Sequence, residues 1–156
     1  MALRDYYTIT KPRIIYGNLF VAAGAFLLAS HWHIDGVRFL TMLGGLGLII
    51  ASSCVLNNYH DRDIDVAMER TRTRASVTGT LSPRTLLIYA FALGILGSVI
   101  LYFFVNTSAL LSSLFGLFAY LVPYTMLAKR GTHWGTLIGS VSGAMPPVVG
   151  YVAVTN

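Results

Sequence analysis

Residues 57–65 read Asn57-Asn58-Tyr59-His60-Asp61-Arg62-Asp63-Ile64-Asp65. This stretch directly follows an apolar run, and with residues 66–74 it holds four of the chain's six acidic residues and four of its eleven basic residues. A dense polar cluster at the end of a hydrophobic segment is costly to place in a membrane protein and usually has a function. The stretch therefore indicates where the functional site lies.

Three side chains of this stretch recur at intervals of four residues: Asn57, Asp61 and Asp65. If the preceding apolar helix continues to about Arg70, the three side chains share one helix face. At a rise of ~1.5 Å per residue, the two carboxylates lie about 6 Å apart along the axis. Mg²⁺ prefers oxygen ligands and binds one or two carboxylates together with substrate phosphates. The spacing predicts a magnesium site at Asp61 and Asp65, with Asn57 adding a carbonyl oxygen or a hydrogen bond to phosphate.

A second interpretation of the stretch is a solvated loop whose acidic and basic side chains pair with one another. Carboxylates at positions i and i+4 are common on helices, so the spacing alone does not decide between the two. In the first interpretation, nearby arginines neutralise the phosphate oxygens that the metal leaves uncovered. These arginines are Arg62, Arg70, Arg72 and Arg74.

The composition is that of an integral membrane protein. Of 156 residues, 55% are hydrophobic and only 11% are charged, and the mean hydropathy is +0.67. A soluble domain carries about 25% charged residues. The net charge of +5 therefore marks the cytoplasmic side of the membrane rather than a nucleic-acid surface. The single cysteine, Cys54, excludes an intramolecular disulfide.

Apolar segments long enough to cross a membrane predict an all-α polytopic bundle, in one transmembrane domain over residues 1–156. The predicted spans are residues 14–30, 39–56, 85–105, 109–127 and 135–154. Thr10-Lys11-Pro12-Arg13 is expected as a turn entering the membrane, and Ser82-Pro83 as a helix cap followed by the first helical residue. Pro146-Pro147 is expected to kink or unwind the last span.

The basic residues also predict the orientation. Ten of the eleven lie before the first span, between the second and third, or between the fourth and fifth, and only Arg38 lies on the other side. Positive residues favour the cytoplasmic side. We therefore expect the N-terminus and the acidic stretch on the cytoplasmic face of the cell (inner) membrane.

The pattern Asn57-x3-Asp61-x3-Asp65 resembles the first aspartate motif of the UbiA-type intramembrane prenyltransferases. The longer stretch, with Met68, Arg70, Thr71 and Arg74, is similar to the branch of that family that farnesylates haem. Three further segments resemble the same branch: Thr10-Lys11-Pro12-Arg13, the run from Tyr124-Thr125 to Lys129-Arg130, and Gly139-x3-Gly143-Ala144-x-Pro146-Pro147-x2-Gly150-Tyr151.

The resemblance implies a fold of about nine transmembrane helices around a central cavity, with two aspartate motifs on cytoplasmic loops. Magnesium bridges these motifs to a prenyl diphosphate. In the haem-farnesylating branch, farnesyl diphosphate is transferred to a vinyl group of haem b, which gives haem O and pyrophosphate. No second aspartate motif occurs in the 156 residues. We therefore expect the chain to be the N-terminal half of such an enzyme and incomplete for catalysis, with the C-terminal half or other haem-pathway membrane proteins as partners.

The resemblance and the spacing together select the site residues. The candidates for catalysis and metal binding are Asn57, Asp61 and Asp65. The candidates for substrate binding are Asn58, Arg62, Arg70, Arg74, Tyr124, Lys129, Arg130 and Lys11. Lys129 and Arg130 also fit a role as topology anchors, and Tyr124 also fits the aromatic belt at a membrane surface. The four histidines are not assigned as haem ligands, because haem is a substrate here.

Two alternatives remain at this point. Another prenyltransferase of the same superfamily would act on a quinone-precursor or chlorophyll-type ring, and the acceptor pocket would distinguish it. Half of a transporter, or a membrane scaffold, would also explain broken helices. Against the latter, the polar cluster lies at the membrane edge and no charged residue lies in the middle of a span.

Overall fold

The computed structural model describes residues 3–31, 33–69, 71–128 and 134–156, and within these ranges it contains helices and no strands. The helices are α1 (Leu3–Ile9), α2 (Pro12–Ala29), α3 (Gly36–His60), α4 (Arg62–Asp65), α5 (Pro83–Phe104), α6 (Thr107–Ala119), η1 (Tyr120–Ala128), α8 (Gly135–Gly143) and α9 (Met145–Thr155).

Five helical segments of the described chain are long and apolar enough to cross a membrane. They are Pro12–Ala29, Gly36–His60, Pro83–Phe104, Thr107–Ala128 and Gly135–Thr155. The predicted all-α polytopic bundle is therefore confirmed. The predicted ranges fall on these helices, with most starts two or three residues late because capping residues and the first helical turn are more polar than the span.

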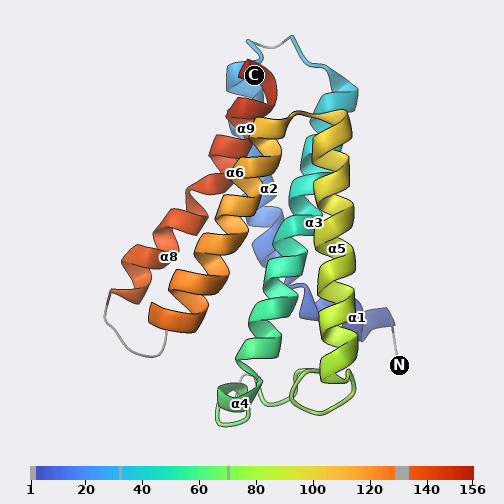
Figure 1. Ribbon diagram of the computed structural model, residues 1–156, viewed down its shortest axis with the longest axis vertical. Helices are drawn as coiled ribbons and strands as arrows, with labels where there is room; N and C mark the ends of the chain where they lie inside the picture. Colours follow the sequence, from blue (N-terminus) through green and yellow to red (C-terminus); the bar gives the residue numbers. More distant parts are fainter. Residues whose placement is uncertain (1–2, 32, 70, 129–133) are drawn as a thin grey trace.

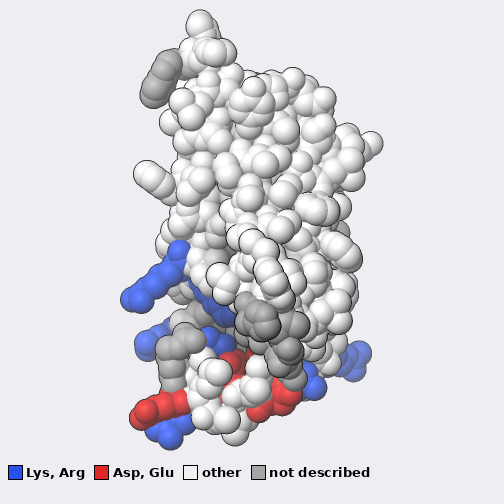
Figure 2. Space-filling model, turned by 90° about the vertical axis from the view of Figure 1, so that its left-hand side faces the viewer, with Lys and Arg blue, Asp and Glu red and all other residues white. Residues whose placement is uncertain are grey.

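The bundle has two different ends (Figure 1). At one end lie α1, α4 and the loop that joins α4 to α5, and at the other lie the C-terminus and the turn between α5 and α6. Figure 2 shows that, on the face it presents, the charged side chains of the described residues gather toward the first of these ends, while the other described residues of that surface are uncharged. This charge distribution separates a polar end from an apolar body, as expected of a membrane protein.

Close helix contacts depend on glycine at two places. A Cβ at Gly97 of α5 would lie 2.7 Å from the carbonyl oxygen of Gly45 on α3, so these helices touch through backbone. A Cβ at Gly150 of α9 would collide with the carbonyl oxygen of Ala22 on α2. Small residues allow this approach between membrane helices. The two contacts join α3 to α5 and α2 to α9.

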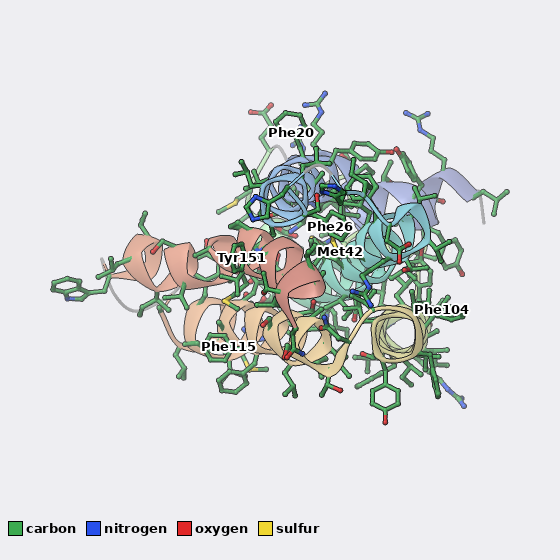
Figure 3. All side chains as sticks on the ribbon, turned by 90° about the horizontal axis from the view of Figure 1, so that it is seen from above. Phe20, Phe26, Met42, Phe104, Phe115 and Tyr151 are labelled. Atoms are coloured by element: carbon green, nitrogen blue, oxygen red, sulfur yellow. The ribbon has the colours of Figure 1, made fainter. Side chains whose placement is uncertain are left out.

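A buried core forms where α2, α3, α6 and α9 meet. Phe26 and Met42 are its largest fully buried side chains, and Figure 3 shows them between the helices. Phe104, Phe115 and Tyr151, by contrast, are exposed, and Figure 3 shows Phe104 and Phe115 on the outside of the bundle. An apolar outer surface is the expected lipid-facing surface of a membrane bundle.

The helix starts and the interruption that were expected at proline residues are present in the structure. Pro12 is the first residue of α2, and Pro83 is the first residue of α5, where the Ser82 hydroxyl accepts a hydrogen bond from the Thr85 N–H at 3.1 Å. The last span is interrupted at Ala144, directly before Met145-Pro146-Pro147. Proline lacks an N–H and starts helices more readily than it continues them.

One prediction about the acidic stretch was wrong. The helix was expected to continue to about Arg70, but α3 ends at His60, and only the short α4 follows it. Asp61 has φ −85° and ψ 1°, outside the helical region. Beyond α4, the Asp65 carbonyl accepts a hydrogen bond from the Thr71 hydroxyl at 3.0 Å. The chain therefore folds back on itself after Asp65 instead of extending as a helix.

Candidate active site

The three residues at four-residue intervals stay together despite the end of α3. The Asp61 N–H donates to the Asn57 carbonyl at 2.9 Å, and the Asp65 N–H donates to the Asp61 carbonyl at 2.9 Å. The side chains are connected as well, because Asn57 Nδ2 donates to Asp61 Oδ2 at 2.9 Å. Asp61 is 1% exposed and Asp65 is 5% exposed. The structure therefore places two carboxylates on consecutive turns inside the protein.

A cation from the start of the chain reaches this group. Lys11 Nζ donates to Asn57 Oδ1 at 2.6 Å, which joins the turn between α1 and α2 to the end of α3. This hydrogen bond uses the amide oxygen of Asn57, the atom that was expected to face a metal. In this arrangement Asn57 presents its amide nitrogen to Asp61, so it orients the carboxylate rather than adding an oxygen beside it.

The loop after α4 supplies the second cation. Arg74 Nη1 forms an ion pair with Asp65 Oδ2 at 2.6 Å and donates to Asn58 Oδ1 at 3.2 Å. Asn58 in turn donates to the Ile9 carbonyl at 2.7 Å. Together with the hydrogen bond from the Thr71 hydroxyl to the Asp65 carbonyl, these bonds hold the loop, α1 and the end of α3 together. A buried carboxylate is stable only when such partners compensate its lost hydration.

The fourth span enters the site through a π-helical segment. In η1 the Thr125 hydroxyl donates to the Tyr120 carbonyl at 2.8 Å and accepts from Asn57 Nδ2 at 3.2 Å. Thr125 is fully buried. Pro123 lies inside η1, where it removes a backbone donor and favours a wider turn. Such π-segments often occur at functional sites.

The other predicted substrate-binding residues, and Arg72 of the same acidic stretch, lie in several places. The guanidinium of Arg62 lies over the Tyr59 ring, 4.4 Å from its centroid, and Arg62 donates to the Tyr59 carbonyl rather than to the buried aspartates. Tyr124 stacks on Tyr120 with ring centroids 5.6 Å apart. Arg72 is exposed near Glu69, at 3.9 Å. Arg70, Lys129 and Arg130 lie outside the residues that the structure describes.

An apolar pocket of about 230 Å³ opens beside this group of polar residues. Ser53 and Cys54 line it one turn before Asn57, and Tyr120 lines it on the η1 side. Gly139 and Gly143 of α8 form part of its wall, where the absence of side chains leaves room. A cavity of about 150 Å³ takes up benzene, so this pocket is large enough for a segment of a longer apolar chain.

The donor set suits magnesium. The two carboxylates offer the hard oxygen ligands that Mg²⁺ prefers, and Mg²⁺ typically uses only one or two of them with water and phosphate completing its shell. Within the described ranges no group of three or more His, Cys, Asp and Glu side chains could hold a metal alone. The residues therefore fit a metal shared with a phosphate ligand rather than a closed protein site.

Sequence reasoning did not identify Thr125 as a site residue. A single threonine in an apolar span carries no spacing signal, and its partner Asn57 is 68 residues away. The signal that was available is Pro123, because a proline within a span predicts a local departure from α-helical geometry.

Comparison with known proteins identifies the class. Residues 18–156 match the UbiA prenyltransferase family, and the chain belongs to that family. The chain is 50% identical over 156 residues to a protein named protoheme IX farnesyltransferase from Yersinia pestis (strain Pestoides F), covering all of this chain and 53% of that protein. It is also 50% identical to the protein of that name from Serratia proteamaculans (strain 568), over 99% of this chain and 52% of that protein.

The chain thus spans about half the length of the curated relatives it matches. No solved structure matches it significantly. The family assignment agrees with the resemblance seen in the aspartate stretch, and it removes the transporter and scaffold alternatives, because the family is one of prenyltransferases.

Proposed function

We propose that the protein, at full length, transfers a farnesyl group from farnesyl diphosphate to a vinyl group of haem b, in the membrane. The observation that carries the proposal is the pair of buried carboxylates, Asp61 and Asp65, beside an apolar pocket between the helices. The names of the relatives, about half of whose length this chain spans, favour haem over a quinone-precursor or chlorophyll-type ring as the acceptor.

In the proposed reaction the bond between the farnesyl carbon and the diphosphate oxygen breaks. The terminal vinyl carbon bonds to the farnesyl carbon, and water adds to the neighbouring carbon with loss of one proton. Asp61 and Asp65 would hold Mg²⁺, which neutralises charge on phosphate oxygens as the diphosphate leaves. Asn57 fixes the position of Asp61, as its hydrogen bond at 2.9 Å indicates.

Cations and aromatic rings of the chain would serve the same step. Lys11 and Arg74 stand beside the buried carboxylates, where they can bind phosphate oxygens once a metal takes the carboxylates. We assign the same role to Lys129, Arg130 and Arg70. Tyr124 stacks on Tyr120, which lines the pocket, and would offer a ring face to the allylic cation. The farnesyl chain would occupy the apolar pocket.

The orientation proposed from the basic residues fits this chemistry. Farnesyl diphosphate is a water-soluble anion at one end and apolar at the other. A site at the charged end of the bundle can bind the diphosphate, and the pocket between the helices can hold the apolar chain. We propose that this end faces the cytoplasm and that the membrane is the inner (cell) membrane, because basic loops remain on the cytoplasmic side.

The test is product formation by the full-length protein in liposomes with haem b, farnesyl diphosphate and Mg²⁺, read by mass spectrometry. Wild-type protein should form farnesylated haem, and Asp61→Ala and Asp65→Ala should each lower the rate by roughly 100-fold or more. Asp63→Ala is the matched control, because Asp63 is an exposed carboxylate of the same short helix. Equal loss in all three variants, or no product from the wild type, would refute the proposal.

A further inference from the structure

A second pocket, of about 400 Å³, lies on the α1 side of the polar end. Its walls come from α1, from the turn before α2, from the end of α3 at Asn58, and from residues 73–75 of the loop after α4. Figure 1 shows α1 at the same end of the bundle as α4. The pocket is distinct from the apolar pocket between the helices, because the two share no lining residue.

The charge of this pocket is mainly positive. Arg4, Lys11 and Arg74 line it, against one acidic side chain, Asp5. Lys11 and Arg74 are held by Asn57 and by the buried aspartate at position 65. Within the described part of the chain, the guanidinium of Arg4 makes no hydrogen bond or ion pair. Arg4 therefore brings five uncommitted N–H donors to a pocket that already contains two ordered cations.

The backbone at Lys11 is held in an unusual conformation. Its φ is 56° and its ψ is 64°, in the left-handed region that side chains other than glycine rarely adopt. Such strain occurs mostly where it positions a functional group. Here Lys11 lines the pocket, and its ammonium donates to Asn57.

The depth of the pocket indicates where its ligand comes from. Lys11 directly precedes α2, which is a candidate membrane span from its first residue. Leu3 and Tyr7 of α1 are exposed, and the Tyr7 hydroxyl lies 2.9 Å from the hydroxyl of Tyr16 in the first turns of α2. Tyrosines are enriched where a membrane protein passes from hydrocarbon to headgroups. If α2 crosses the membrane from Pro12 onward, the pocket lies at the level of the lipid phosphates.

We propose that this pocket binds a phosphate group, held by Arg4 together with Lys11 and Arg74. A basic pocket at this depth fits the headgroup of an anionic phospholipid, and the same chemistry would accept free phosphate. The site does not depend on the proposed farnesyl transfer. It shares Lys11 and Arg74 with the donor site proposed above, whereas Arg4 and Thr73 line only this pocket.

The experiment uses the full-length protein in EDTA, so that metal-dependent binding at the two aspartates does not contribute. Phosphatidylglycerol retained by protein extracted from vesicles of phosphatidylglycerol and phosphatidylcholine is measured by native mass spectrometry. Inorganic phosphate is tested separately by its effect on the melting temperature, against chloride at equal ionic strength. Arg4→Ala and Arg4→Lys are compared with Arg84→Ala, an exposed arginine in the first turn of α5 that does not line the pocket.

Arg4→Ala should lower the affinity roughly tenfold for whichever probe the wild type binds. Arg4→Lys should recover part of it, and Arg84→Ala should match the wild type. Binding of phosphatidylglycerol alone would identify a lipid headgroup as the ligand, binding of phosphate alone would identify a soluble phosphate, and either supports the site. Equal effects of Arg4→Ala and Arg84→Ala, or no binding of either probe by the wild type, would overturn it.

Discussion

The two ends of the bundle both carry polar side chains, but they use them differently. At the end that holds the C-terminus, which we call the apolar end, Asp35 is exposed and accepts hydrogen bonds from the N–H groups of Val37 and Arg38 in the first turn of α3, both at 3.0 Å. At the charged end, Asn57 is buried and bonds to Lys11 and Thr125, which are 46 and 68 residues away. The first arrangement caps a helix, and the second assembles a site.

The difference shows which polar contacts indicate function. A cap satisfies the free N–H groups at a helix start and needs no burial. Asn106 goes further, because it caps α6 and also donates to the Val152 carbonyl of α9 at 2.8 Å, yet this contact only joins two helices. What distinguishes the charged end is that ionisable groups, Asp61 and Asp65, are themselves buried there. Burial of charge is costly, so it indicates a function more strongly than a distant contact does.

The largest effect on stability is expected from Arg74. Arg74→Gln removes the ion-pair partner of Asp65 and should destabilise the metal-free protein by about 2 kcal/mol, below the usual 3–5 because Arg74 is partly exposed. Thermal unfolding in EDTA measures this, and added Mg²⁺ should restore part of the loss.

The matched control for Arg74 is Arg72→Gln. Arg72 and Glu69 are exposed and 3.9 Å apart, so this change should alter stability by less than about 0.5 kcal/mol. Equal melting temperatures for the two variants would contradict a structural role for the buried ion pair.

An intermediate effect is expected from Thr125. Thr125→Val keeps the shape but removes the acceptor of Asn57 Nδ2 and the donor to the Tyr120 carbonyl. Because Thr125 positions Asn57 and does not touch the substrate in this account, kcat should fall roughly tenfold while KM stays the same. Thr125→Ser should retain activity.

Thr155→Val is the control for that measurement. Its hydroxyl makes a hydrogen bond to the Tyr151 carbonyl within its own helix, at the other end of the bundle. It should leave kcat unchanged. A fall in kcat as large as that of Thr125→Val would mean that loss of any such hydroxyl slows the enzyme, and the positioning role would be lost.

The smallest effect is expected at the apolar end. Asp35→Ala removes the cap of α3 and should cost about 1 kcal/mol of stability. Steady-state rates at a temperature well below unfolding should stay at the wild-type value, since Asp35 and the site lie at opposite ends of α3. A loss of activity comparable to that of Thr125→Val would contradict the assignment of function to the charged end alone.

The sequence predicted the spans because membrane helices need long apolar runs, and it predicted the breaks because Pro12, Pro83 and Pro146 act locally. The extent of α3 was predicted wrongly. Polar periodicity continues past His60, but α3 ends there, and contacts from Thr71 and Arg74 hold Asp65 where the chain folds back. Those contacts form only after the loop folds back, so no local sequence pattern predicts them.

The candidate site was predictable to a similar degree. Intervals of four residues correctly identified Asn57, Asp61 and Asp65 as neighbours, since the i→i+4 backbone bonds persist through the end of the helix. The hydrogen bonds of Asn57 to Lys11 and Thr125 were not predictable, because packing of three separate segments decides them. The metal-binding role of the aspartates stays a prediction.

The most direct test of that role is Mg²⁺-dependent binding of an unreactive farnesyl diphosphate analogue to the full-length protein, by calorimetry. Asp61→Asn and Asp65→Asn keep the side-chain shape and remove one charge each, and Asp63→Asn makes the same change on the exposed side of α4. We predict tight binding only with Mg²⁺, lost in the first two variants and unchanged in the third. Binding that persists in Asp61→Asn and Asp65→Asn, or that needs no Mg²⁺, would contradict the account.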